Sequence, residues 1–111
     1  MTEIWHNPRC SKSRAALALL SVHCGTNGFT IVRYLETPPS RARIEEVVEL
    51  LGGDARVLLR EKDAPEALAR ADRDAIVSAL VSSPFLIERP VVITARGARV
   101  ARPPETLLEI L

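Results

Sequence analysis

The sequence predicts an α/β protein in which a β-α-β unit and a β-β-α unit flank a block of helices. Two short β-rich segments enclose a helical segment at the start of the chain, helix-spaced apolar residues fill its middle, and two more β-rich segments precede a final helix. The 111 residues are enough for one hydrophobic core but not for two. We therefore expect a single domain over residues 1–111, with a helical insert at about residues 40–83.

The first unit is expected to begin with a short strand at residues 2–5 that ends in a polar turn. A helix follows at about residues 11–23, with Ser11 or Ser13 as its cap. Residues 29–35 are rich in β-branched and aromatic side chains, which predicts a second strand. A strand, a helix and a strand at this spacing predict a parallel pair joined by a right-handed crossover.

The middle of the chain is expected to be helical. Ser40 caps its first helix, in which apolar residues follow the helical spacing of one buried face: Ile44, Val47, Val48 and Leu51. Shorter helices are expected at residues 54–60, 64–70 and 74–83. The side chains that should face inward from the last of these helices are Ile76, Val77, Leu80 and Val81.

The final unit is expected to hold two strands, at residues 90–94 and 98–101, joined by a tight turn at Arg96 and Gly97. Residues 103–111 predict a closing helix, because proline suits the first turn of a helix. Without the central helices the order is β-α-β-β-β-α, which is a thioredoxin-like layout.

The composition excludes several classes of partner. The 15 basic and 14 acidic residues nearly balance, so no global field would recruit nucleic acid or a membrane surface. The longest apolar stretches are too short to span a membrane, and the first residues read directly into a strand rather than a signal peptide. We therefore expect a cytoplasmic protein, in which a reactive thiol is more common than a disulfide.

Cys10 is the candidate nucleophile. It lies between the first strand's loop and the first helix, where unpaired helix amides stabilise a thiolate and can cradle a tetrahedral oxyanion. Basic or potentially basic neighbours, namely His6, Arg9, Lys12 and Arg14, should also lower the thiol pKa below its free value of roughly 8.5.

The residues around Cys10 restrict its mechanism. Ser13 stands where a CxxC dithiol motif has its second cysteine, so a second thiol must come from outside this motif. Ala16 stands where a C-x5-R phosphatase loop needs arginine. Cys24 is expected about 20 Å away along the helix, beyond disulfide reach. His23 and Cys24 alone give only a weak zinc signal, so we expect no metal site.

The segment from His6 to Arg14, HNPRCSKSR, resembles the HNPxCxxSR signature of the glutaredoxin-dependent arsenate reductase (ArsC) family. Further blocks follow in the family's order across the whole chain: YLETPP at residues 34–39, LLR at 58–60, ERPVVI at 88–93 and ARPPE at 101–105. Within the family, the segment around Cys10 looks most like that of the uncharacterised housekeeping relatives.

The resemblance implies a thioredoxin-like fold with a helical insertion and an arsenate reductase activity. Cys10 would attack arsenate or a similar oxyanion, and glutathione and glutaredoxin would then resolve the adduct; glutathione would be a co-substrate, with no bound cofactor. Three arginines would hold the oxyanion, and a cis-proline would lie beside the cysteine. His6 and Ser13 would hold the thiolate, with Ser13 donating a hydrogen bond to it. The arginines are Arg60, Arg89 and Arg102, and the proline is Pro90.

Two alternatives remain open at this stage. A related glutathione-linked thiol oxidoreductase could use the same residues on another substrate, since family likeness does not fix the substrate. An Spx-like regulator that binds RNA polymerase would share the fold. Ser13 weakens its redox-sensing form, which usually carries CxxC.

Overall fold

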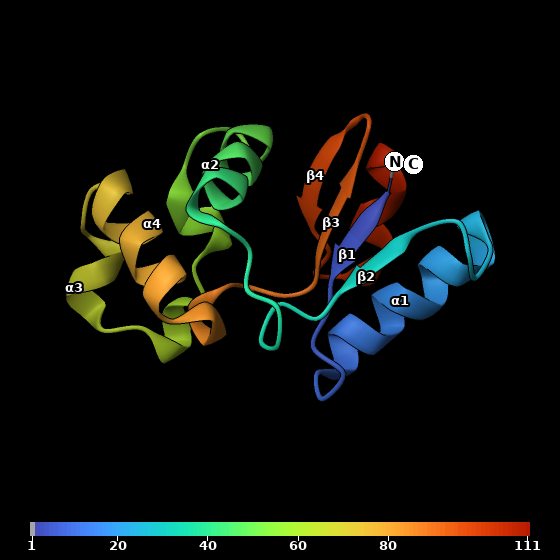
Figure 1. The fold of residues 1–111 in the computed structure, drawn as a ribbon, viewed down its shortest axis with the longest axis horizontal. Helices are drawn as coiled ribbons and strands as arrows, with labels where there is room; N and C mark the ends of the chain where they lie inside the picture. The colour runs from blue at the N-terminus through green and yellow to red at the C-terminus, as the bar shows by residue number, and fades with distance from the viewer. Residues whose placement is uncertain (1) are drawn as a thin grey trace. The chain divides into compact units, whose positions relative to one another are not determined.

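A computed structural model describes residues 2–111, which divide into two compact units (Figure 1). The first unit comprises residues 1–37 and 89–111, and the second comprises residues 38–88. The helical insert expected at about residues 40–83 lies within the second unit. That the two units form a single domain stays a prediction.

The first unit is built on a four-stranded sheet with strand order β2-β1-β3-β4. Strands β1 and β2 run parallel, whereas β3 is antiparallel to both of its neighbours, β1 and β4. In the central pair Ile4 lies opposite Val92, and in the outer pair Ile4 lies opposite Ile31. The strands are β1 (Glu3–Trp5), β2 (Thr30–Val32), β3 (Val91–Thr94) and β4 (Gly97–Val100). This mixed α/β unit has the predicted thioredoxin-like topology.

Helix α1 (Ser11–Cys24) and the closing helix η4 (Pro104–Ile110) cover one face of this sheet. They enclose a hydrophobic cluster to which both helices and two strands contribute: Ile4, Ala16, Leu20, Val92, Ala101, Leu107 and Ile110. Gly25 is the C-cap that ends helix α1, and its amide donates to the carbonyl of Ser21. Its φ of 77° is disfavoured for residues other than glycine. This cluster packs the middle and the C-terminal half of α1 against the sheet.

The second unit is helical. Its main helices are α2 (Arg41–Leu50) and α4 (Arg73–Ser82), with α3 (Glu66–Ala69) and the 3₁₀ turns η1 (Ala55–Leu58), η2 (Glu61–Asp63) and η3 (Pro84–Leu86). Ser40 caps α2 as predicted, since its hydroxyl accepts the Arg43 amide. The core of this unit is formed by fully or nearly fully buried side chains: Ile44, Val47, Val48, Leu58, Ile76, Val77 and Leu80.

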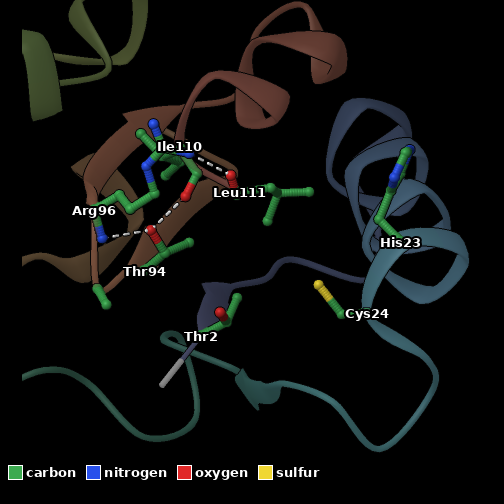
Figure 2. A pocket seen from close by; sticks show the side chains of 8 residues that line it. Thr2, His23, Cys24, Thr94, Arg96, Ile110 and Leu111 are labelled. Atoms are coloured by element: carbon green, nitrogen blue, oxygen red, sulfur yellow. Dashed lines mark hydrogen bonds between the residues drawn. The ribbon is translucent and has the colours of Figure 1, made fainter.

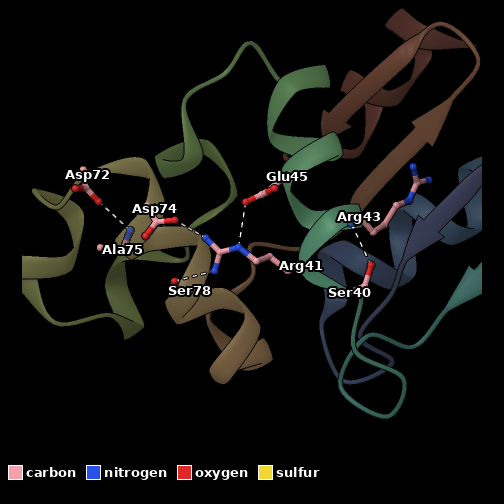
Figure 3. A network of polar contacts seen from close by, with 8 residues as sticks. All are labelled: Ser40, Arg41, Arg43, Glu45, Asp72, Asp74, Ala75 and Ser78. Atoms are coloured by element: carbon pink, nitrogen blue, oxygen red, sulfur yellow. Dashed lines mark hydrogen bonds and ion pairs between the residues drawn. The ribbon is translucent and has the colours of Figure 1, made fainter.

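Arg41 joins the two main helices of the second unit (Figure 3). Its guanidinium donates to Glu45 on its own helix and, across to α4, to Asp74 at 2.5 Å and to the Ser78 hydroxyl at 2.9 Å. Arg41 therefore links α2 to α4 at the surface through its fork of donors.

Several predicted elements differ from those observed. The strand expected at residues 29–35 ends at Val32, because a turn closed by the Glu36 amide on the Arg33 carbonyl follows it. The segment expected as a helix at residues 54–60 is a short 3₁₀ turn at Ala55–Leu58. The closing helix expected at residues 103–111 is present at Pro104–Ile110, but it is a 3₁₀ helix. Val81, expected to face inward, is 38% exposed. Neither Ser11 nor Ser13 caps α1; its N-cap is Cys10, with no side-chain cap hydrogen bond.

Candidate active site

Cys10 occupies the N-cap of α1, directly after the loop that leaves β1. The loop is folded by its own polar groups: Asn7 accepts the Arg9 amide through its side chain and the Cys10 amide through its carbonyl, both at 3.0 Å. The Cys10 carbonyl accepts the Arg14 amide, which begins the helix. The half-buried thiol therefore lies at the positive end of the helix dipole.

The pKa of the Cys10 thiol is lowered below its ordinary value. Burial raises the pKa, but this effect is outweighed by hydrogen bonds to the sulfur from the Ser13 amide, the Arg89 side chain and the Lys12 amide, and by the charge of Arg89. Helix amides therefore stabilise the thiolate, as predicted from its position. The cation that assists them is Arg89, which is distant in the sequence and was not among the neighbours expected to supply charge.

Arg89 and Arg102 lie next to Cys10 in the first unit. A guanidinium nitrogen of Arg102 (Nη1) is 4.0 Å from the Cys10 Sγ atom and donates to the Arg89 carbonyl at 2.8 Å. The Arg89–Pro90 peptide bond is cis, the conformation that the resemblance implied for Pro90; the Arg102–Pro103 bond is also cis. The structure thus brings a thiol of lowered pKa and two guanidinium groups together from the two halves of the first unit.

His6 and Ser13 form a buried pair, but not in the predicted arrangement. The Ser13 hydroxyl oxygen accepts the Asn7 amide at 3.0 Å and lies 2.6 Å from His6 Nδ1. Burial lowers the pKa of His6, and the charges of Arg33 and Arg14 lower it further. The Ser13 hydroxyl is thus hydrogen-bonded to His6 and Asn7 rather than to the sulfur, and Ser13 contacts Cys10 through its backbone amide.

Arg60 belongs to the second unit, as do the two carboxylates that it contacts. It is 8% exposed, and its guanidinium pairs with Asp63 at 2.6 Å and with Glu88 at 3.1 Å. Burial would lower its pKa, but these two carboxylates raise it above the ordinary value. The guanidinium is therefore a fixed cation, and its expected contact with an oxyanion stays a prediction.

The opposite end of α1 carries the second free thiol (Figure 2). Cys24 lies in the last turn of the helix, partly buried against the hydrophobic cluster, and lines a cavity of about 400 Å³ with His23, Thr94 and Arg96. Within residues 2–111 there is no group of three or more side chains that could hold a metal ion.

Arg33 is a residue near the site that the sequence reasoning missed. It follows β2, and the His6 amide bonds the Val32 carbonyl at 2.8 Å, so the segments after β1 and β2 lie side by side. A signal for this was present in the sequence, since parallel strands bring the residues after their carboxyl ends to the same edge of a sheet.

A thioredoxin-like sheet with a thiol of lowered pKa at the amino end of its first helix, flanked by two arginines, is the arrangement of a thiol protein that can hold and attack an oxyanion. The model of the ArsC family matches residues 5–110, and this chain belongs to that family. Across the described residues, no helix is both long enough and apolar enough to cross a membrane.

Named relatives agree with this assignment. The chain is 44% identical to the uncharacterised Escherichia coli protein YfgD, over 98% of this chain and 95% of that protein. It is 40% identical to an Escherichia coli arsenate reductase, over 97% of this chain and 79% of that protein. The solved structure of an arsenate reductase from Vibrio cholerae superposes with a TM-score of 0.88 at 38% identity and covers 99% of this chain and 97% of that one.

Proposed function

We propose that this protein is an arsenate reductase in which Cys10 forms a covalent thiol–arsenate adduct that glutathione and glutaredoxin resolve. The observation that carries the proposal is the lowered pKa of Cys10 in contact with Arg89 and helix amides. Such a site supplies both a nucleophile and donors for a tetrahedral anion. Relatives named arsenate reductase support arsenate as the oxyanion.

In the proposed first step the Cys10 thiolate attacks the arsenic atom of bound arsenate. A sulfur–arsenic bond forms, and one oxygen leaves as water after it has been protonated. Arg89 and Arg102 neutralise the oxyanion charge through paired, charge-assisted hydrogen bonds. The resemblance assigns Arg60 as the third arginine of this set.

The remaining steps need thiols from other molecules, because Ser13 replaces the second cysteine of a dithiol motif. Glutathione attacks the arsenic of the adduct and displaces a second oxygen as water. A glutaredoxin thiolate then attacks the glutathione sulfur: a sulfur–sulfur bond forms between glutaredoxin and glutathione, the bond between the glutathione sulfur and arsenic breaks, and its electron pair reduces arsenic from As(V) to As(III). Hydrolysis of the Cys10–arsenic bond releases arsenite and restores the thiolate.

A glutathione-linked thiol oxidoreductase with another substrate is the second candidate. The similarity to YfgD, whose name carries no substrate, favours keeping this candidate. Both candidates use Cys10 in the same way, so only the substrate separates them.

The test is arsenate-dependent oxidation of NADPH, coupled through glutathione, glutaredoxin and glutathione reductase. We expect turnover with the wild-type protein and none with Cys10→Ser. Absence of turnover in a wild-type protein whose Cys10 still titrates as an acidic thiol would contradict arsenate as the substrate and favour the second candidate. Binding to RNA polymerase without need of Cys10 would favour the Spx-like alternative.

A further inference from the structure

A second cavity, of about 520 Å³, lies at the carboxyl ends of the parallel strands β1 and β2. Its wall consists of residues 6–9, which precede Cys10, together with Arg33, Leu35 and Glu36 from the turn after β2. This volume is within the range of about 300–1,000 Å³ typical of small-molecule sites. Neither Arg89 nor Arg102 lines it, so the cavity is separate from the guanidinium groups assigned to the oxyanion.

Arg9 gives this cavity an available cation. The other arginine side chains of the described part of the chain have a hydrogen bond or an ion pair, whereas the Arg9 guanidinium has neither with any residue from 2 to 111. Arg9 is exposed and directly precedes the nucleophile in the sequence. An unpaired guanidinium on a cavity wall is free to bind a carboxylate without first losing a partner.

Arg33 contributes a second cation that is only loosely paired. Its guanidinium lies 3.9 Å from the Glu36 carboxylate, and both side chains are largely exposed, at 60% and 70%. An ion pair of this kind contributes little free energy and is easily exchanged for another partner. The charge of Arg33 is felt by His6, another residue of the cavity wall, whose pKa it helps to lower.

We propose that this cavity binds glutathione through its carboxylates, an inference that rests on the proposed function. Glutathione carries two carboxylates and one ammonium group at neutral pH. The cavity offers the complementary set: the guanidinium groups of Arg9 and Arg33 and the carboxylate of Glu36. Leu35, which is 47% exposed, provides an apolar contact for the methylene groups of the peptide. The co-substrate and the oxyanion would thus be held by different residues.

The binding test uses S-methylglutathione, which cannot form a disulfide, in calorimetric titration of the full chain. We expect Arg9→Ala and Arg33→Ala each to raise its dissociation constant by about threefold to tenfold, because each removes a charge-assisted contact. Arg70→Ala, which removes an exposed arginine of the second unit, is the matched control and should leave binding unchanged. Glutathione diethyl ester, which lacks both carboxylates, should bind the wild type weakly.

The kinetic test separates this site from the oxyanion site and from the proposed function. In the coupled assay both variants should raise the KM for glutathione and leave the KM for arsenate unchanged. Equal binding of S-methylglutathione by the wild type and the variants would overturn the proposal, as would a change confined to the KM for glutaredoxin, which would assign the cavity to a protein partner. Arginine-dependent binding of S-methylglutathione without arsenate turnover would support the cavity assignment while contradicting the proposed substrate.

Discussion

The two ends of helix α1 carry one free cysteine each, and they differ in what surrounds the sulfur. Cys10 precedes the first turn, where amides without helical partners and the Arg89 guanidinium stabilise a thiolate. Cys24 lies in the last turn, at the negative end of the dipole, against apolar side chains (Figure 2). Arg96, which lines the same cavity as Cys24, donates a hydrogen bond to the Leu111 carbonyl. Two half-buried cysteines at the ends of one helix are therefore distinguished by the polarity of the helix and by the Arg89 guanidinium that contacts only Cys10 of the two.

The largest expected effect comes from replacing each sulfur in turn. Cys10→Ser should abolish arsenate reduction, since a serine hydroxyl at this position is a far weaker nucleophile than a thiolate. Cys24→Ser should keep nearly full activity, because the proposed steps use no second cysteine of this chain. The coupled NADPH assay on both purified variants measures this difference. An inactive, folded Cys24→Ser protein would contradict the outside-thiol mechanism.

The next effect concerns the guanidinium group beside Cys10. Arg89→Ala should weaken arsenate binding by about tenfold to a hundredfold, the cost of a lost hydrogen bond to a charged group. It should also raise the pKa of Cys10, which loses both a hydrogen bond and a positive charge. Arg96→Ala, at the Cys24 end, is the control and should change neither quantity. Arsenate kinetics and pH-dependent alkylation measure the two effects, and unchanged values in Arg89→Ala would remove Arg89 from the site.

Ser13→Ala tests how the Cys10 end is held together. The loss of a buried hydroxyl that serves both His6 and Asn7 should lower the free energy of unfolding by about 1–3 kcal/mol, measured in urea. The pKa of Cys10 should change little, because the Ser13 backbone amide, which remains, makes the contact. A pKa that rises as far as in Arg89→Ala would show instead that the hydroxyl stabilises the thiolate.

The smallest effect is a pH dependence of stability that arises from His6. Its pKa is lowered in the folded protein, so the unfolded chain takes up a proton first as the pH falls below about 6.5. Stability should therefore decrease as the pH falls through this value and towards the lower folded pKa. His6→Asn keeps a polar group near the Nδ1 position for Ser13 but cannot titrate in this range. Its melting temperature should therefore decrease less than that of the wild type as the pH falls. An identical pH dependence in both proteins would exclude His6 as its source.

The sequence predicted the Cys10 end of this comparison better than the rest of the site. The helix start, the sheet topology and the polar loop before Cys10 follow from local patterns of turn residues and apolar spacing. The contact of Arg102 with Cys10 joins residues 92 positions apart, and only the family resemblance suggested it.

Other features of the site depend on tertiary structure and could not be predicted from the sequence. The lowered pKa of His6 arises from burial and from the charge of Arg33, which lies near it because β1 and β2 pair in parallel. The Ser13 hydroxyl was expected to face the sulfur, but the folded loop directs it to His6 and Asn7. The strand expected to reach residue 35 stops at Val32, because the turn that follows buries Tyr34 outside the sheet.

The central claim is that the amino end of α1 makes Cys10 an acidic thiol, and its most direct test is the pH dependence of Cys10 alkylation. The rate of reaction with iodoacetamide would be followed by mass spectrometry in Cys24→Ser, so that Cys10 is the only sulfur nucleophile. A midpoint clearly below the free-thiol value of roughly 8.5 is predicted. A midpoint at or above that value would contradict the account of the site and, with it, the proposed attack on arsenate.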